Sequence, residues 1–150
     1  MRKHTLFAKM SKCLFATSQV EYLGHVISAK GVATDPSKIE AMDNWPEPKI
    51  LKQLRGFLGL AGYYRRFIQG YASISSPLTQ LLKKDSFKWS EDASIAFNKL
   101  KQQMIQAPVL ALPDLTKEFT IKMDASGIGI GAVLQQEGLL IAYMSRTLSK

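Results

Sequence analysis

The sequence predicts an α+β fold, in which a short β-hairpin comes first, helices fill the middle and three antiparallel strands follow. Three observations predict it: alternating apolar and polar residues over 20–28, apolar residues at helical spacing over 54–68 and 93–104, and alternation again from residue 119. The chain has 150 residues, of which 46% are hydrophobic. That content suits a packed core and argues against an intrinsically disordered chain.

The first predicted strands lie at about 13–16 and 20–28, with the turn residues "ATSQ" between them. Two strands alone are not stable as a sheet in water, so the hairpin needs further partners. A hairpin that packs on the later helices is an alternative that the residues leave open.

The first predicted helix begins at Asp35, a residue type that caps helices, and has Pro36 at its first position. Ile39 and Met42 mark one apolar side of this short helix. The residue before each proline of "WPEP" is pushed out of the helical region, so the helix ends there.

A longer helix follows, with apolar residues at helical spacing: Leu54, Phe57, Leu58, Ala61, Tyr64 and Ile68. A second face of the same helix carries Lys52, Arg55, Gly56, Gly59 and Tyr63. Each glycine inside a helix costs about 1 kcal/mol against alanine. Their presence beside Lys and Arg suggests a surface that a partner approaches closely, or else a site of close helix–helix packing.

The charge pattern favours an anionic partner. The formal net charge is +8, and the segment from Pro48 to Lys84 has no acidic residue. Its cations stand among aromatic residues, as expected for contacts with a phosphate backbone: Lys49, Lys52, Arg55, Arg65, Arg66, Lys83 and Lys84. Nucleic acid is therefore the first partner expected, and a merely solvated rim is the alternative.

Two further helices are expected before the last strands. One is interrupted or begins near Pro77, and the other runs over about 91–106 with Ser90 as its cap. The second helix has a stripe of residues expected to be buried: Ala93, Phe97, Leu100 and Met104. Pro108 and Pro113 then mark a linker.

The stretch "MDASGIGIGAVLQQ" begins at Met123 and contains the acidic residue of greatest interest, Asp124. It does not fit a dinucleotide-binding loop, because position 134 is Leu and a strand rather than a helix follows. Asp124 is expected to end the strand "FTIKMD" and could ligate a metal; an Asx turn with Ser126 is the alternative. "GIGAVLQQ" and "LLIAYMSRTL" are predicted strands joined by the tight turn "QEG".

Several classes of protein are disfavoured by composition. Cys13 is a lone cysteine, so a disulfide framework and a cysteine-rich zinc site are excluded. The N-terminal residues are too polar for a signal peptide, and no apolar run reaches the length of a membrane span. We expect an intracellular location, in the cytoplasm or nucleus, and no membrane partner.

A series of motifs occurs in order along the chain: "KCLF", "VEYLGHVIS", "WPEP", "LRGFLGLAGYYRRFI", "PLTQLLKK", "APVLALPD" and "DASGIGIGAVLQQ". Together they resemble the Pol polyprotein of gypsy-type LTR retrotransposons, over the C-terminal part of its reverse transcriptase and the start of its ribonuclease H. The resemblance spans nearly the whole chain. An ordered series of this kind is far more specific than any one motif.

The resemblance implies a domain organisation and a set of site residues. Residues 1–33 would be the end of the palm, 34–84 the thumb, 85–113 a connecting segment, and 114–150 the first strands of a ribonuclease H-like domain. In such a protein the thumb holds an RNA–DNA or DNA duplex, and Asp124 is the first ribonuclease carboxylate, a ligand of Mg²⁺. The resemblance implies nucleic-acid binding by Leu23, Gly24 and His25 at the primer grip and by Lys52, Gly56 and Leu60 along the minor groove. The helix face and the basic stretch described above add Arg55, Gly59, Arg65 and Arg66 to the expected binding residues.

The same resemblance predicts that catalysis is lost. The aromatic residue and aspartate pair of the polymerase site do not occur here, and after Asp124 the only acidic residue is Glu137. Ile50 also replaces the usual capping Thr or Ser, and Met123 and Met144 replace the usual Thr and Phe. We expect an inactive fragment that binds no metal tightly and keeps weak nucleic-acid binding, with other polyprotein segments as possible partners. The alternative is a domesticated, non-enzymatic interaction module for nucleic acid or protein.

Overall fold

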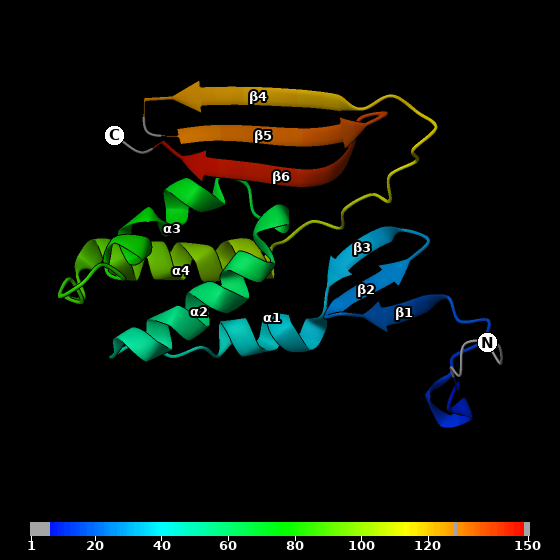
Figure 1. The fold of residues 1–150 in the computed structure, drawn as a ribbon, viewed down its shortest axis with the longest axis horizontal. Helices are drawn as coiled ribbons and strands as arrows, with labels where there is room; N and C mark the ends of the chain where they lie inside the picture. The colour runs from blue at the N-terminus through cyan, green and yellow to red at the C-terminus, as the bar shows by residue number, and fades with distance from the viewer. Residues whose placement is uncertain (1–6, 128, 149–150) are drawn as a thin grey trace.

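The computed structural model describes residues 7–127 and 129–148, and it confirms the α+β fold class. Two three-stranded antiparallel sheets flank a group of helices (Figure 1). The second sheet lies with β6 nearest the helices and β4 farthest from them (Figure 1). Within the described ranges, no helix is both long enough and apolar enough to cross a membrane.

The first sheet corrects the predicted hairpin. It has three strands, β1 (Gln19–Tyr22), β2 (His25–Ser28) and β3 (Gly31–Thr34), in that spatial order. The predicted strand at 13–16 is wrong, because those residues follow the short 3₁₀ helix η2 (Met10–Lys12) without entering a sheet. The prediction of one strand over 20–28 is also wrong, since a turn at Leu23 and Gly24 divides it.

The turn was missed because its first residue carries no turn signal. Leu23 and Gly24 have φ angles of +49° and +74°, the left-handed pair that a two-residue hairpin turn needs. A leucine rarely adopts such an angle. β3 supplies the third strand that the predicted hairpin lacked. The sheet therefore has the partner strand that two strands alone need for stability in water.

The helices are α1 (Pro36–Asp43), α2 (Leu51–Tyr63), η3 (Arg65–Phe67), α3 (Tyr71–Gln80) and α4 (Glu91–Ile105). Two predicted caps are confirmed: Asp35 Oδ1 accepts the Ser37 N–H at 2.8 Å, and Ser90 Oγ accepts the Ala93 N–H at 3.3 Å. α2 begins after Ile50, which offers no capping side chain. Gln53 Oε1 instead accepts the Lys49 N–H at 2.7 Å, so one donor near this helix start is satisfied.

The expectation of a break or a start at Pro77 is wrong, because α3 begins at Tyr71 and continues through the proline. Pro77 lacks the N–H that would donate to the Ser73 carbonyl, so one helical bond is lost. Leu78 and Ser75, on either side of the proline, are both buried. Burial against the other helices therefore outweighs the local preference of the proline.

The core lies among the helices and draws on every one of them. All six residues of the predicted apolar face, and all four of the α4 stripe, are buried. The prediction of one helix through Ile68 is wrong, because α2 ends at Tyr63 and Ile68 follows η3 in an extended conformation. Phe57 of α2 and Phe97 of α4 bring their ring centroids to 4.5 Å, and Trp45 packs edge-on against Phe57. The predicted thumb and connecting segments therefore share one hydrophobic core.

The second sheet consists of β4 (Thr120–Ser126), β5 (Gly129–Gln136) and β6 (Leu139–Thr147), with β5 in the centre. The predicted "QEG" turn is confirmed, since Glu137 and Gly138 both have positive φ angles. β4 continues for two residues beyond Asp124, so the expectation that Asp124 ends the strand is wrong. Every residue of β4 is exposed.

The linker between α4 and β4 joins the two sheets. Leu110 pairs with Val32 of β3 through two backbone hydrogen bonds, of 2.7 and 2.8 Å, and the Ala111 N–H donates to the Leu140 carbonyl of β6 at 2.6 Å. Gly31 permits this joint: its φ is +126°, and a Cβ there would lie 2.1 Å from the Leu110 oxygen. The linker therefore fixes β6 beside the first sheet and the helices.

Candidate nucleic-acid interface and metal-site residue

The exposed face of α2, which we call the α2 face, consists of Lys52, Arg55, Gly56, Gly59 and Tyr63, all solvent-exposed as predicted. The two glycines differ in their surroundings. A Cβ on Gly56 would meet the Trp45 ring at 3.4 Å, whereas a Cβ on Gly59 would meet no atom within 4 Å. Gly56 therefore packs against Trp45 inside the molecule, whereas the space above Gly59 is open to a partner. Leu60 is half-buried and packs against the core.

The cations of the segment from Pro48 to Lys84 are all exposed. Among the residues that the structure describes, the single ion pair is between Lys117 and Glu137, so none of these cations is neutralised by a carboxylate. Arg55, Lys83 and Lys84 line one hollow of about 510 Å³ together with Asp85. Arg65 and Arg66 line a different cavity, so the predicted basic residues fall into two groups.

The predicted primer-grip residues lie against the C-terminal end of α2. The Tyr63 hydroxyl donates to the Leu23 carbonyl and the Tyr64 hydroxyl to the Gly24 carbonyl, each at 2.6 Å. The His25 ring lies 5.4–5.6 Å from the rings of Tyr63, Tyr64 and Phe67. Burial raises the pKa of Tyr64 to about 12, with a smaller contribution from the nearby charge of Asp35.

These two tyrosines form what we call the tyrosine clamp, the pair of hydroxyl contacts from Tyr63 and Tyr64 to the Leu23–Gly24 turn. Helical spacing places Tyr63 on an exposed face and Tyr64 on the apolar one, so it does not predict the clamp. The two residues lie 40 positions from the turn along the chain. No local pattern reports a contact at that separation.

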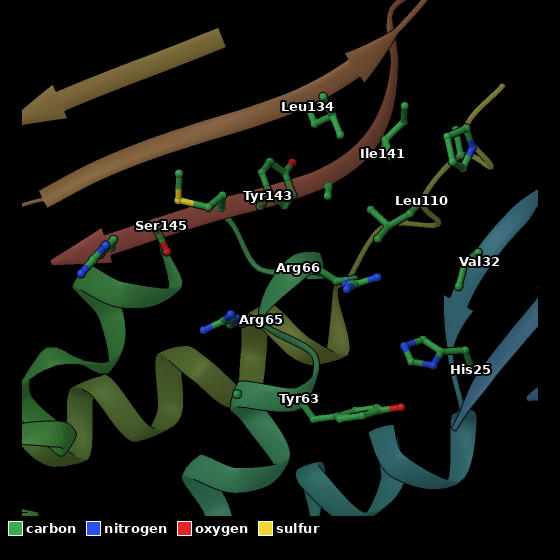
Figure 2. A pocket seen from close by; sticks show the side chains of 16 residues that line it. His25, Val32, Tyr63, Arg65, Arg66, Leu110, Leu134, Ile141, Tyr143 and Ser145 are labelled. Carbon is green, nitrogen blue, oxygen red and sulfur yellow. The ribbon is translucent and has the colours of Figure 1, made fainter. Parts of the chain in front are cut away.

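Arg65 and Arg66 of η3 line a cavity of about 1070 Å³ between the end of α2, the first sheet and β6 (Figure 2). Figure 2 shows the two arginines between β6 on one side and His25 and Tyr63 on the other. Arg146 of β6 also lines the cavity, and sequence reasoning missed it. The signal that could have found it is the run "SR" on a strand with no nearby acidic residue.

Asp124 lies on β4, directly opposite Gly131 of β5, and its side chain is exposed. The Asx-turn alternative is wrong, because Asp124 and Ser126 both pair within the sheet, with Gly131 and Gly129. Asp124 lines a hollow of about 300 Å³ that includes Lys122 and the start of α3.

Other carboxylates lie far from Asp124 along the sheet. Glu118 precedes it by six residues, and Glu137 follows its partner Gly131 by six, which corresponds to roughly 20 Å in a strand. Two-metal catalysis needs carboxylates around ions about 4 Å apart. The described part of the chain contains no group of three His, Cys, Asp or Glu residues that could hold a metal ion. These residues do not fit a two-metal site.

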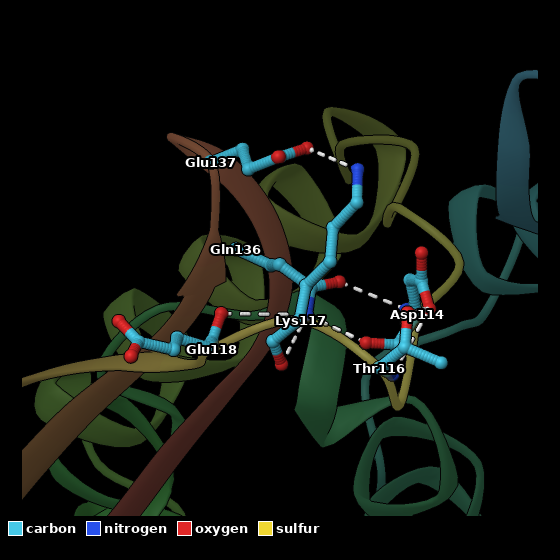
Figure 3. Close-up of polar contacts among 6 residues, drawn as sticks. All are labelled: Asp114, Thr116, Lys117, Glu118, Gln136 and Glu137. Carbon is cyan, nitrogen blue, oxygen red and sulfur yellow. Dashed lines mark hydrogen bonds and ion pairs between the residues drawn. The ribbon is translucent and has the colours of Figure 1, made fainter.

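Glu137 has a different role, in a polar cluster at the far end of the sheet (Figure 3). It pairs with Lys117 at 3.0 Å. The buried amide of Gln136 accepts the Asp114 N–H and donates to the Asp114 carbonyl, both at 2.8 Å, and donates to the Lys117 carbonyl at 3.2 Å. Hydrogen bonds from Thr116 lower the pKa of Asp114. This cluster fixes the loop before β4 to the end of β5.

Comparison with known proteins identifies similar regions in retroelement proteins. Residues 89–150 match the RNase H-like domain found in reverse transcriptase. The uncharacterized mitochondrial protein AtMg00860 of Arabidopsis thaliana is 53% identical over 81% of this chain and 78% of its own length. The retrovirus-related Pol polyproteins from the Drosophila melanogaster transposons 297 and gypsy are 41% and 40% identical, over 94% and 93% of this chain. The chain spans only 14% and 15% of the length of those polyproteins.

The fold is also similar to that of solved structures. The foamy viral protease-reverse transcriptase in complex with an RNA/DNA hybrid has a TM-score of 0.84 over 93% of this chain and 20% of its own, at 23% identity. The same viral protein in complex with dsDNA gives a TM-score of 0.81 over 89% of this chain and 29% of its own. At this identity the likeness concerns the fold alone.

Proposed function

We propose a function for this chain from its family: it belongs to the family of the Arabidopsis thaliana protein AtMg00860 and is homologous to the reverse transcriptase and ribonuclease H region of retrotransposon Pol polyproteins. The proposed function is the binding of RNA–DNA or DNA duplexes without polymerase or nuclease turnover. The proposed origin is a gypsy-type element, with the palm, thumb, connecting and ribonuclease H-like segments divided at residues 33, 84 and 113. An intracellular location stays a prediction.

The observation that carries the proposal is the α2 face with its uncompensated cations. Lys52 and Arg55 are exposed one turn apart on α2, and Gly59 follows Arg55 by four residues with open space above it. A phosphate backbone gains from such cations, and an open glycine lets it approach the helix closely. The foamy viral enzyme with the similar fold was solved with dsDNA and with an RNA/DNA hybrid, which supports a duplex as the partner.

The proposed contacts extend from α2 to the neighbouring turn. Leu23, Gly24 and His25 would meet the primer strand, with the tyrosine clamp holding them at the end of α2. Lys52, Gly56 and Leu60 would lie along the minor groove, although the partial burial of Leu60 limits the surface that it can offer. Arg55 would contact phosphate together with Lys83 and Lys84.

We propose no catalytic step for Asp124. In the intact parent enzyme this aspartate would be one ligand of Mg²⁺, but the residues described around it do not supply the other carboxylates of such a site. Asp124 therefore stands as a single metal-ligand candidate in an incomplete set. Other segments of a polyprotein could be partners for the exposed sheet that carries it.

Salt-dependent duplex binding tests the proposal. Each phosphate contact contributes about 0.9 to the slope of log affinity against log salt. For K52A/R55A we expect that slope to fall by about 2 in fluorescence anisotropy with a labelled RNA–DNA duplex. The matched control is K88A/K99A, which removes two exposed charges from outside the α2 face and should leave the slope unchanged. Equal salt slopes in the two variants would mean that Lys52 and Arg55 do not contact phosphate and are only solvated surface charges.

Nuclease turnover needs a separate assay, with an RNA–DNA hybrid and Mg²⁺. We expect no cleavage above background and no difference between the wild type and Asp124→Asn. Primer extension should likewise be absent. Cleavage by the wild type that disappears in the Asp124→Asn variant would contradict the inactive assignment.

A second candidate is an interaction module that binds protein rather than nucleic acid. The observation that favours it is the apolar side of the second sheet, where Ile121 and Met123 are 62% and 69% exposed. Exposed apolar strands of this kind mark either a partner surface or a tendency to aggregate. A cooperative unfolding transition of a monomer in dilute buffer, without nucleic-acid binding, would favour this candidate over the first.

A further inference from the structure

The cavity of about 1070 Å³ beside η3, here called the arginine cleft, is built by segments from most of the chain. His25 comes from β2 and Val32 from β3, while Leu110 comes from the linker. One side is made by Tyr63, Arg65 and Arg66, and the opposite side by the β6 residues Ile141 to Arg146 (Figure 2). The cleft therefore exists only where the helices and the two sheets are assembled together.

The cleft is strongly cationic. Arg65, Arg66 and Arg146 all line it, each guanidinium belongs to an exposed residue, and no acidic residue of the described chain is among the lining. Within those residues, the single ion pair involves Lys117 and Glu137 and no arginine. Three uncompensated guanidinium groups around one hollow attract phosphate, since each offers a planar fork of donors.

The remaining wall is aromatic and apolar. Tyr63, 52% exposed, and Tyr143 both line the cleft, and His25 lies beside Tyr63 with a centroid distance of 5.4 Å. Aromatic faces beside cations are the features with which proteins bind single-stranded nucleic acid, because bases stack on rings while phosphates meet the charges.

The size of the cleft favours a single strand of nucleic acid over a duplex. Its volume is close to that of sites for small molecules, which corresponds to a few nucleotides of one strand and not to a turn of double helix. A single strand can turn its bases toward a wall, whereas a paired base has its faces covered by its neighbours. The cleft thus suits unpaired bases followed by their phosphates.

We propose that the arginine cleft binds a short stretch of single-stranded nucleic acid, with phosphates on Arg65, Arg66 and Arg146 and a base stacked on Tyr63. This site and this ligand are different from the duplex proposed for the α2 face. The two proposals share Tyr63 and His25, but they can be tested separately, because Lys52 and Arg55 do not line the cleft. Arg65 and Arg66 belong here rather than with the duplex-binding residues.

The test uses fluorescence anisotropy of the full chain with labelled single-stranded DNA and RNA of the same length. R65A/R66A/R146A should weaken binding roughly tenfold or more at low salt and lower the salt slope by about 2, since each phosphate contributes about 0.7 on a single strand. The control K38A/K88A/K99A removes three exposed charges from outside the cleft and should change affinity less than about twofold. Equal losses in the two variants, with equal slopes, would overturn the proposal.

The tyrosine provides a second arm. Tyr63→Leu removes the ring and should weaken single-strand binding roughly fivefold or more, whereas Tyr63→Phe keeps the ring and should retain it. K52A/R55A should leave single-strand binding unchanged while it weakens duplex binding. A failure of the duplex proposal would then appear in the duplex titration alone.

Photo-crosslinking of the wild-type protein avoids any question about the folding of variants. With a bromouridine-substituted single strand, mass spectrometry should locate the adducts on peptides that contain Tyr63 or Tyr143. Adducts confined to other peptides, or no adducts at strand concentrations that saturate the protein, would contradict the assignment of the cleft.

Discussion

The helical region, residues 36–105, and the second sheet, residues 120–147, both have the apolar spacing of their element types, yet they bury it very differently. In α2 the side chains of Leu54 and Phe57 are completely buried against neighbouring helices. In β4 the side chains of Ile121 and Met123 alternate as a strand requires and are still more than half exposed. Periodicity thus predicts an element, and burial follows only where another layer lies over it.

The same difference separates the two candidate sites. The α2 face belongs to a helix whose opposite side is buried in the core. Asp124 stands on a strand that is exposed from end to end, and the described residues supply no group of three His, Cys, Asp or Glu side chains around it. For this reason the proposed function places duplex binding on the helices and proposes no catalytic step for the sheet.

The largest effect is expected from a matched pair of truncations, one in the buried side of α2 and one in the exposed strand β4. Phe57→Ala should lower the free energy of unfolding by about 3–5 kcal/mol, because a fully buried ring that packs at 4.5 Å from Phe97 leaves a cavity. Ile121→Ala on β4 should cost less than about 0.5 kcal/mol, since its side chain is mostly exposed. Urea denaturation followed by circular dichroism measures both, and similar costs would break the comparison.

The joint between the two regions gives the next effect. Gly31→Ala should cost roughly 2–4 kcal/mol, because its φ is +126° and the new Cβ would overlap the Leu110 carbonyl. Gly138→Ala is the control: its φ is also positive, but no atom lies within 4 Å of its added Cβ. Hydrogen exchange should accelerate at the amides of Val32 and Leu110 in the Gly31 variant only. Unchanged hydrogen exchange at Val32 and Leu110 would show that their pairing does not join the linker to the first sheet.

The tyrosine clamp should contribute less. Tyr64→Phe removes the hydroxyl that donates to the Gly24 carbonyl, and we expect a loss of about 1 kcal/mol, since the Asp35 N–H still donates to that carbonyl at 3.2 Å. Tyr63→Phe, at a half-exposed residue, should cost less than Tyr64→Phe in the same urea titration. A larger loss for Tyr63 would contradict the assignment of the buried tyrosine as the stronger contact.

The pH dependence of the clamp has a defined sign. Burial raises the pKa of Tyr64 from its ordinary value of 10.0 to about 12 in the folded chain, so its contribution is complete below pH 10 and is lost as the pH rises toward 12. The stability difference between wild type and Tyr64→Phe should be constant below pH 10 and narrow above it. A difference that grows with pH over that range would be inconsistent with a buried, neutral hydroxyl.

The last stability change concerns Gly59 on the α2 face, and it has the opposite sign. Gly59→Ala should stabilise the protein by up to about 1 kcal/mol, because alanine suits a helix interior and the added methyl meets no neighbour. If a duplex approaches the helix closely at this point, the same variant should bind it more weakly. Thermal melting and duplex titration together check the two opposite signs. A gain in stability without any loss of duplex binding would show that the duplex does not approach α2 closely at Gly59.

Much of the helical region could be predicted from sequence because its signals are local. Asp35 and Ser90 are caps of the expected types, and the apolar stripes of α2 and α4 are buried as predicted. The first sheet was predicted less well. Leu23 adopts a positive φ that leucine disfavours, at a turn that contacts made 40 residues away hold in place.

The candidate sites divide in the same way. The exposure of Lys52 and Arg55 followed from helical spacing, whereas the exposure of Asp124 on a continuing strand was not predicted. The arginine cleft did not follow from any pattern, because Arg146 joins Arg65 and Arg66 only when β6 lies beside η3. A cleft lined by segments far apart in the sequence is a product of tertiary packing.

Lysine footprinting of the wild-type protein most directly tests whether duplex binding belongs to the helices and not to the sheet. Lys52 on α2 and Lys122 on β4 are both exposed, so both should react with an acetylating reagent in the free protein. With a saturating RNA–DNA duplex, we predict that acetylation of Lys52 falls several-fold while that of Lys122 is unchanged, as measured by mass spectrometry. Protection of Lys122 with full reactivity at Lys52 would contradict the proposal that the helices, and not the second sheet, bind the duplex.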